Sequence, residues 1–260
     1  MTCPSGARFM AVPVCRWSEP PASLASFRDE VHLWYSSLDP PTPILRRLEG
    51  TLNVDERERV GRFWFEEERT RFVAGRGLLR AILGLYLGIK PSEVHFNYGP
   101  YGKPSLVGEF GLGKIEFNLA HSNGYAIYAF ALNRKVGVDL EQVAPTVEAE
   151  QFANRFFSDQ EKGVIHTLEG KEKLEAFFKI WTAKEAYLKA SGEGLAYPLD
   201  KVDVSLDPGE SPRLSEIRGN VQEDSRLFVE HLRPASDFMA ALVVQGPKCG
   251  LDCWRWPDFN

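Results

Sequence analysis

The 260-residue sequence has no apolar run that approaches the roughly 20 residues needed to span a bilayer. It also has no basic excess, because 31 Lys and Arg stand against 36 Asp and Glu, for a formal net charge of −5. General nucleic-acid binding usually requires a strong basic excess. Prolines interrupt the N-terminal stretch, which has no continuous apolar core of the kind found in signal peptides. We therefore expect a cytoplasmic protein that neither spans a membrane nor binds nucleic acid.

Cysteine is scarce, and its four copies lie near the ends of the sequence, at Cys3, Cys15, Cys249 and Cys253. Their spacings match no standard zinc pattern, so we expect free thiols in a reducing compartment. A zinc site that joins the two ends is the alternative. The sequence also has no GxxxxGK[ST] phosphate loop, which argues against a phosphotransferase built on that loop.

What is present fits a globular α+β protein. A hydrophobic fraction of 43% and a charged fraction of 26% are ordinary for a soluble domain, and the length allows one large domain or two moderate ones. The order of strand, helices and strands occurs once before about residue 135 and once after it. We therefore predict two similar halves, 1–135 and 136–260, with the active site in a cleft between them, because ligand sites are often found at domain interfaces.

The segment 174–191 predicts an amphipathic helix that ends at Gly192. Its apolar residues recur three, four or seven apart. Glu185 lies four residues after Trp181 and four before Lys189, near one edge of the apolar stripe. A carboxylate beside lysines at the margin of a core can hold a cation and stabilise phosphate charge. The alternative is a solvated Glu–Lys pair.

The segment 136–141 predicts a strand whose two faces differ. Gly137, Asp139 and Glu141 share one face, because side chains alternate along a strand. Two neighbouring carboxylates repel each other, and a divalent cation would relieve that repulsion. The alternative is an exposed polar face. Ser158 and Glu161 fit a capping box, so Glu161 has a structural role that competes with any metal role.

The remaining elements follow from local patterns. Asn53 is predicted to cap a charged helix that runs to about residue 68, and a second helix with an apolar face ends at Gly88. Most of the seven arginines between residues 55 and 80 are predicted to form a solvated, salt-bridged face, but Arg76 and Arg80 lie among apolar neighbours and suit phosphate. The predicted strands are 31–35, 94–98, 115–119, 125–132, 202–206, 227–232 and 239–244, with a turn at 121–124.

Taken together, these segments resemble the Sfp-type 4'-phosphopantetheinyl transferase family. The resemblance spans about residues 30–206. It rests on two motifs, Gly137-Val138-Asp139-Leu140-Glu141 and Trp181-Thr182-Ala183-Lys184-Glu185-Ala186-Tyr187-Leu188-Lys189. Supporting pieces are Arg76 with Arg80, the Gly102-Lys103-Pro104 loop, Phe117-Asn118-Leu119-Ala120-His121-Ser122, and Phe156-Phe157-Ser158 with Glu161.

The resemblance implies a monomeric, pseudo-dimeric α+β enzyme that uses Mg²⁺. Such an enzyme moves the phosphopantetheine arm of coenzyme A onto a serine of an apo acyl- or peptidyl-carrier protein. The half 1–135 would hold the 3'-phosphate and nucleotide side, and the half 136–260 the metal and the catalytic helix. By matching position, the metal ligands would be Asp139, Glu141 and Glu185, the catalytic residues Glu185 and Lys189, and the coenzyme A contacts Arg76, Lys103, His121, Ser122, Lys184 and Lys189.

Within that set, the resemblance gives Lys189 and Lys103 to the pyrophosphate, and His121 and Arg76 to the 3'-phosphate. Arg59 and Arg62 stand where the family places further basic residues. One departure is Ala120, where the family commonly has a serine. A non-catalytic module of the same fold that binds coenzyme A or a carrier protein is the alternative function. The sequence does not indicate which carrier protein is modified.

Overall fold

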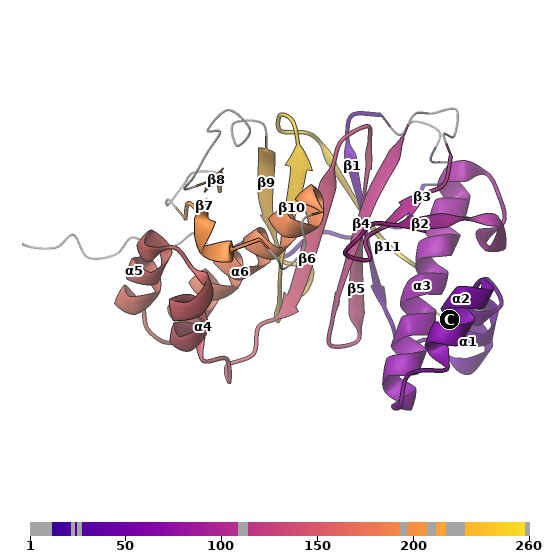
Figure 1. The fold of residues 1–260 in the computed structure, drawn as a ribbon, viewed down its shortest axis with the longest axis horizontal. Helices are drawn as coiled ribbons and strands as arrows, with labels where there is room; N and C mark the ends of the chain where they lie inside the picture. The colour runs from indigo at the N-terminus through magenta and orange to yellow at the C-terminus, as the bar shows by residue number, and fades with distance from the viewer. Residues whose placement is uncertain are drawn as a thin grey trace, which may run out of the picture. The chain divides into compact units, whose positions relative to one another are not determined.

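The computed structural model describes residues 12–21, 24, 28–108, 114–192, 197–206, 212–216 and 227–257. The chain forms two compact units, each with a sheet and a core of its own (Figure 1). Unit 1 is built from residues 1–15 and 134–249, and unit 2 from residues 16–133 and 250–260. No helix within the described residues combines the length and apolarity needed to cross a membrane. Cys15, Cys249 and Cys253 form no disulfide, and Cys3 lies outside the described residues.

The main sheet of unit 2 has the strand order β11-β1-β5-β4, in which only the β11–β1 pair is parallel. The bounds are Val31–Ser37 for β1, Ile115–Ser122 for β4, Tyr125–Leu132 for β5 and Leu251–Arg255 for β11. The predicted turn between β4 and β5 is confirmed. Asn123 and Gly124 both have positive φ, which is typical of a tight two-residue hairpin.

The helices of unit 2 pack their apolar side chains into one core with this sheet. Their bounds are Thr42–Glu49 for α1, Val54–Val60 for α2 and Glu66–Leu87 for α3, followed by a short 3₁₀ helix at Pro91–Glu93 and the hairpin strands β2, Phe96–Tyr98, and β3, Pro104–Leu106. The predicted cap is confirmed, since Asn53 Oδ1 accepts from the Glu56 amide at 2.9 Å. The predicted helix up to residue 68 is wrong beyond Val60, where Gly61 ends α2 and α3 starts at Glu66.

Unit 1 contains a sheet in the order β6-β10-β9, and helix α6 packs on β6 and β10 (Figure 1). The strand bounds are Val136–Gln142 for β6, Val202–Val204 for β7, Leu214–Glu216 for β8, Leu227–Leu232 for β9 and Phe238–Gln245 for β10. The helix bounds are Ala149–Phe156 for α4, Asp159–Thr167 for α5 and Gly170–Ser191 for α6, and a 3₁₀ helix spans Leu199–Lys201.

The close approach of α6 to β6 depends on Gly137. A Cβ atom at this position would lie 2.0 Å from the Ala186 carbonyl oxygen and 2.4 Å from the Ala190 nitrogen, closer than any side chain can come. Glycine therefore lets the backbone of α6 contact the strand directly. Because Gly137 and Asp139 share a face, the same contact brings Asp139 next to the last turns of α6.

Candidate functional site

The acidic residues predicted on β6 and α6 come together in unit 1. Asp139 is only 5% exposed, and its Oδ1 accepts a hydrogen bond from Lys189 Nζ at 2.6 Å. The second oxygen of Asp139, Oδ2, and Glu185 Oε1 are both buried without a hydrogen-bond partner among the described residues. Buried carboxylate oxygens without partners are costly, so these two atoms are well suited to a cation.

The electrostatics of Glu185 reflect this crowding. Burial is the largest cause that raises the pKa of Glu185, and the neighbouring charges of Asp139 and Glu141 raise it further. Lys189 acts in the opposite direction and lowers it. The three carboxylates therefore repel one another through a partly desolvated region, with one ammonium offsetting part of the charge.

The predicted metal ligands are not gathered into a tight sphere. Across the described residues, three ligand atoms of three different side chains lie within 4.8 Å of one another only at Glu30, His32 and Asp252, which are in unit 2. The Asp139 carboxylate is instead paired with Lys189. The donor chemistry still fits a hard cation. Asp139 Oδ2 and Glu185 Oε1 are buried without hydrogen-bond partners among the described residues, and the charge of Glu141 acts on Glu185.

Lys184 does not lie where a ligand could reach it. Its side chain is fully buried, and Nζ donates to the carbonyls of Leu199 at 2.9 Å and Val202 at 2.6 Å. It also forms an ion pair with Glu161 Oε2 at 2.5 Å. The structure thus gives Lys184 a role inside the core, and we leave it out of the proposed coenzyme A contacts.

Glu161 has the structural role that the capping box predicts. Its carboxylate accepts from the Ser158 amide at 2.8 Å and from the Val204 amide at 2.8 Å, in addition to Lys184. Burial raises the pKa of Glu161 and lowers that of Lys184. Glu161 and Lys184 are paired with each other and with backbone groups of the core, so Glu161 is not a metal ligand in this arrangement.

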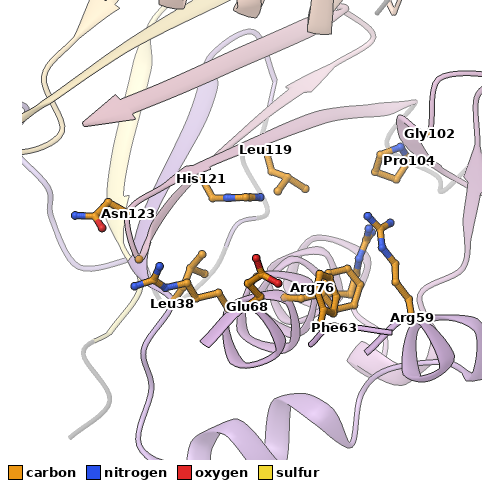
Figure 2. Close-up of a pocket in the computed structure, with 14 residues that line it drawn as sticks. Leu38, Arg59, Phe63, Glu68, Arg76, Gly102, Pro104, Leu119, His121 and Asn123 are labelled. Carbon is orange, nitrogen blue, oxygen red and sulfur yellow. The ribbon is translucent and has the colours of Figure 1, made fainter. Parts of the chain in front are cut away.

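Unit 2 contains a pocket of about 520 Å³ that is lined by cations and aromatic rings. Its lining includes Arg59, Arg71, Arg76 and His121 beside Phe63, Phe72, Leu38 and Leu119. In Figure 2, His121 and Leu119 project from β4 toward α3, which carries Glu68 and Arg76. A pocket with positive groups on apolar walls suits a phosphorylated ligand with a ring system.

Arg76 and Arg80, which the sequence grouped together, have different environments. Arg76 lines the pocket, its guanidinium lies 5.2 Å from the Phe96 ring centre, and its buried Nη1 has no hydrogen-bond partner among the described residues. Arg80 is fully buried, with Nε 2.8 Å from Glu56 Oε2 and Nη1 donating to the carbonyls of Pro91 and Val94. Arg80 does not line the pocket and is ion-paired in the core, so the prediction that it suits phosphate is wrong. Arg76 lines the pocket, although its Nε also lies 3.5 Å from Glu56 Oε1.

The predicted contacts Lys103 and Ser122 are not among the residues that line this pocket, although their neighbours in the sequence are. Gly102 and Pro104, on either side of Lys103, line it, as do Asn123 and Gly124, which follow Ser122. Arg71, one of the arginines predicted mostly to form a salt-bridged face, pairs with Glu67 at 2.6 Å and with Asp39 at 3.4 Å, and it also lines the pocket.

Ala120 lies between two pocket-lining residues but is not among those that line the pocket. Leu119 and His121 face the pocket, so Ala120 points to the opposite face of β4, where it is 4% exposed.

Comparisons with known proteins identify the family. Residues 135–243 match the model of the 4'-phosphopantetheinyl transferase superfamily, and residues 39–133 match that of the N-terminal part of 4'-phosphopantetheinyl transferase. The chain is 44% identical to the 4'-phosphopantetheinyl transferase HetI of Nostoc sp., over 88% of this chain and 94% of HetI.

Two further relatives have the same activity in their names. A putative 4'-phosphopantetheinyl transferase of Synechocystis sp. is 34% identical over 65% of this chain and 68% of its own length. The 4'-phosphopantetheinyl transferase Sfp of Bacillus subtilis is 30% identical over 62% of this chain and 69% of its own length. The chain therefore belongs to the Sfp-type 4'-phosphopantetheinyl transferase family.

Proposed function

We propose that this protein transfers the 4'-phosphopantetheine arm of coenzyme A to a serine of an apo acyl- or peptidyl-carrier protein and releases 3',5'-ADP. The observation that carries the proposal is the 44% identity to a 4'-phosphopantetheinyl transferase over nearly the whole of that relative. We assign the nucleotide side of the substrate to the half 1–135, and the metal and the catalytic helix to the half 136–260.

Mg²⁺ is the proposed metal, with Asp139, Glu141 and Glu185 as its ligands. The buried Asp139 Oδ2 and Glu185 Oε1 support this, because magnesium prefers hard oxygen donors and neither atom has a hydrogen-bond partner among the described residues. When bound, the ion would neutralise charge on the pyrophosphate of coenzyme A. Lys189, whose Nζ lies 2.6 Å from Asp139 Oδ1, is the proposed cation that stabilises negative charge on the departing 3',5'-ADP.

Glu185 is the proposed general base that takes the proton of the carrier serine as its oxygen attacks the phosphorus next to pantetheine. In the metal-free protein, burial and then the charge of Asp139 raise the pKa of Glu185, and a bound cation would lower it again. The same residue is a proposed metal ligand, so the proton can pass to it directly or through a water bound at the site.

The unit 2 pocket is proposed to bind the nucleotide phosphate of coenzyme A. Arg76 and His121 line it and would contact the 3'-phosphate, with Arg59 as a further cation. Lys103 is proposed at the pyrophosphate, and Ser122 follows His121 along β4.

The test is to incubate the protein with several apo-carrier proteins, coenzyme A and Mg²⁺, and to measure the intact mass of each carrier. We expect at least one carrier to gain one phosphopantetheine arm. Asp139→Asn and Glu185→Gln should each reduce the rate by about 100-fold or more, whereas the exposed Glu172→Gln, on the same helix, should leave it unchanged.

Two outcomes would contradict this proposal. A folded protein that modifies none of the carriers would favour the non-catalytic module that only binds coenzyme A or a carrier. Near-normal rates in both Asp139→Asn and Glu185→Gln would overturn the residue assignments. We further propose that the enzyme acts as a monomer in the cytoplasm, which light scattering and cell fractionation would test.

A further inference from the structure

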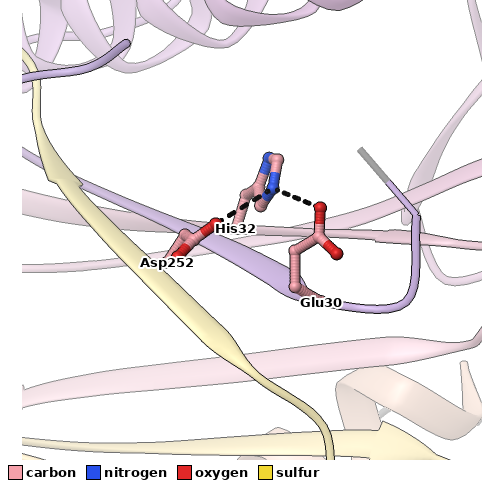
Figure 3. A group of neighbouring side chains, drawn as sticks. All are labelled: Glu30, His32 and Asp252. Carbon is pink, nitrogen blue, oxygen red and sulfur yellow. Dashed lines mark hydrogen bonds and ion pairs between the residues drawn. The ribbon is translucent and has the colours of Figure 1, made fainter. Parts of the chain in front are cut away.

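A second cluster of ligating side chains lies in unit 2. Glu30 precedes β1, His32 lies on β1, and Asp252 is the residue of β11 that pairs with His32. Figure 3 shows the imidazole of His32 with one ring nitrogen directed at both carboxylates. None of these residues belongs to the coenzyme A pocket or to the acidic group around Asp139.

The distances in this cluster are those of ligands that share one ion. His32 Nε2 lies 3.3 Å from Glu30 Oε1 and 3.7 Å from Asp252 Oδ2, and one ligand atom from each residue lies within 4.8 Å of the others. The longer contact exceeds a hydrogen bond. Ligand atoms about 2.1 Å from a tetrahedral zinc ion stand about 3.4 Å apart. His32 and Glu30 are within hydrogen-bond range of each other, and the three side chains lie close to the spacing that one metal ion would need.

The imidazole is held in place from its other side. Nδ1 lies 2.8 Å from the Tyr86 hydroxyl, which also accepts from Trp34 Nε1 at 3.0 Å, and the Trp254 ring packs edge-on at 4.4 Å. Histidines that bind metals usually donate their second N–H to an oxygen, and a phenolic oxygen can accept two hydrogen bonds. Tyr86 can thus accept a hydrogen bond from a proton held on Nδ1, and in that tautomer the Nε2 lone pair points toward the two carboxylates and can bind a metal.

Burial defines the direction from which an ion would arrive. The side chain of His32 is 4% exposed, while those of Glu30 and Asp252 are 26% and 56% exposed. The ion would therefore bind on the solvent side of the ring, with water completing its coordination.

We propose that Glu30, His32 and Asp252 form a binding site for a divalent transition-metal ion of the zinc class. One imidazole nitrogen and two carboxylates suit Zn²⁺ or Co²⁺, whereas Mg²⁺ prefers a shell made of oxygen alone. Since the ligands come from both β1 and β11, the ion ties the last strand of the sheet to its neighbour.

The test is a titration of the full chain with Co²⁺, whose absorption reports its ligands, in excess Mg²⁺ to occupy the acidic group of unit 1. We expect one equivalent of Co²⁺ to bind without a sulfur charge-transfer band, and Zn²⁺ to displace it and raise the Tm. The double variant Glu30→Gln/Asp252→Asn should lose this equivalent and the Tm rise. The matched control Glu49→Gln, an exposed acid of unit 2, should keep both.

A second variant separates metal binding from a general structural role. Tyr86→Phe should keep the stoichiometry but weaken Co²⁺ binding by about 10–100-fold, as loss of an outer partner of a ligating histidine does. Unchanged Co²⁺ binding in the double variant, a thiolate band that points to the cysteines, or no binding in the parent protein would each overturn the proposal. Transfer to carrier proteins should be unaffected by the double variant, so a failed transferase assay would not decide this question.

Discussion

Glu185 has a proposed catalytic role, but its buried position beside other carboxylates disfavours its charged form. Its pKa is raised chiefly by burial and then by Asp139, so the folded protein binds a proton at this residue more tightly than the unfolded chain does. Stability therefore falls as the pH rises from the ordinary carboxyl pKa to the raised one, and the loss persists at neutral pH. Sites that need such groups commonly give up stability for activity.

We predict that Glu185→Gln raises the Tm at pH 7 in the absence of Mg²⁺ and reduces transfer by about 100-fold or more. The amide removes the buried charge and its repulsion with Asp139, which are the two main causes of the raised pKa. The gain should shrink as the pH falls through the carboxyl range, because Glu185 is then protonated in both states. Thermal unfolding from pH 4 to 8 measures this, and a Tm at pH 7 below that of the parent would contradict it.

Lys184 and Lys189 show why residue roles were only partly predictable. Both lie in the same motif of α6, and the sequence placed both at the substrate. Lys189 does face Asp139, one of the proposed metal ligands, because it lies one turn after Glu185. Lys184 points into the core, where its partners Glu161, Leu199 and Val202 come from distant segments that no local pattern of α6 reveals.

We predict that Lys184→Met destabilises the protein by about 3–5 kcal/mol, since it leaves the Glu161 carboxylate buried without its cation. The matched control is Lys162→Met, which removes a surface ion pair with Asp159 and should cost about 1 kcal/mol or less. Urea unfolding measures both. A small effect of Lys184→Met on stability together with a raised KM for coenzyme A would restore Lys184 to the substrate contacts.

At the scale of elements, the long and strongly patterned segments were predictable. The helix α6, the capped start of α5 and the β4–β5 hairpin all follow from local signals that the structure confirms. The short helices α1 and α4 were not predicted, because eight residues carry little periodicity. Strand β11 was also not predicted, because its pairing with β1 joins residues that are far apart in the sequence.

We predict that Gly137→Ala lowers stability by about 1–3 kcal/mol or more and reduces transfer. The added methyl would overlap the backbone of α6 at Ala186 and Ala190, and so move Lys189 and Glu185 away from Asp139. Gly163→Ala is the control. It lies within α5 with no atom near the new Cβ, and should be neutral or stabilising by about 0.5–1 kcal/mol. Equal stability and activity in the two variants would show that the close approach is unimportant.

On the scale of the whole molecule, the described residues form two hydrophobic cores. One core surrounds Phe177, Ile180 and Val243 in unit 1, and the other surrounds Trp34, Leu79 and Phe130 in unit 2. The two-part organisation followed from the repeated order of elements. The sequence did not indicate that the residues after Gly250 complete the earlier unit, because that requires the pairing of β11 with β1.

We predict that the two cores lose hydrogen-exchange protection separately. Trp254→Ala should weaken unit 2 by about 3–5 kcal/mol and deprotect α3, while α6 keeps its protection. Met239→Ala should do the reverse, since Met239 is fully buried in unit 1. Exchange followed by peptide mass analysis reads both helices. Equal loss in both helices from each variant would mean that the molecule opens as a single cooperative block.

The pairing of β11 with β1 also bears on how the protein is made. Ribosomes synthesise the strands in order, so the strands of unit 1 that the structure describes, β6 to β10, are made after β1 and before its parallel neighbour β11. A nascent chain can therefore fold unit 1 while β1, in the sheet of unit 2, still lacks its partner β11. The sheet of unit 2 therefore cannot be completed until β11 has been synthesised. Its completion is a late step that pairs residues far apart in the sequence. Until then one edge of β1 has no strand partner, and unpaired strand edges favour aggregation.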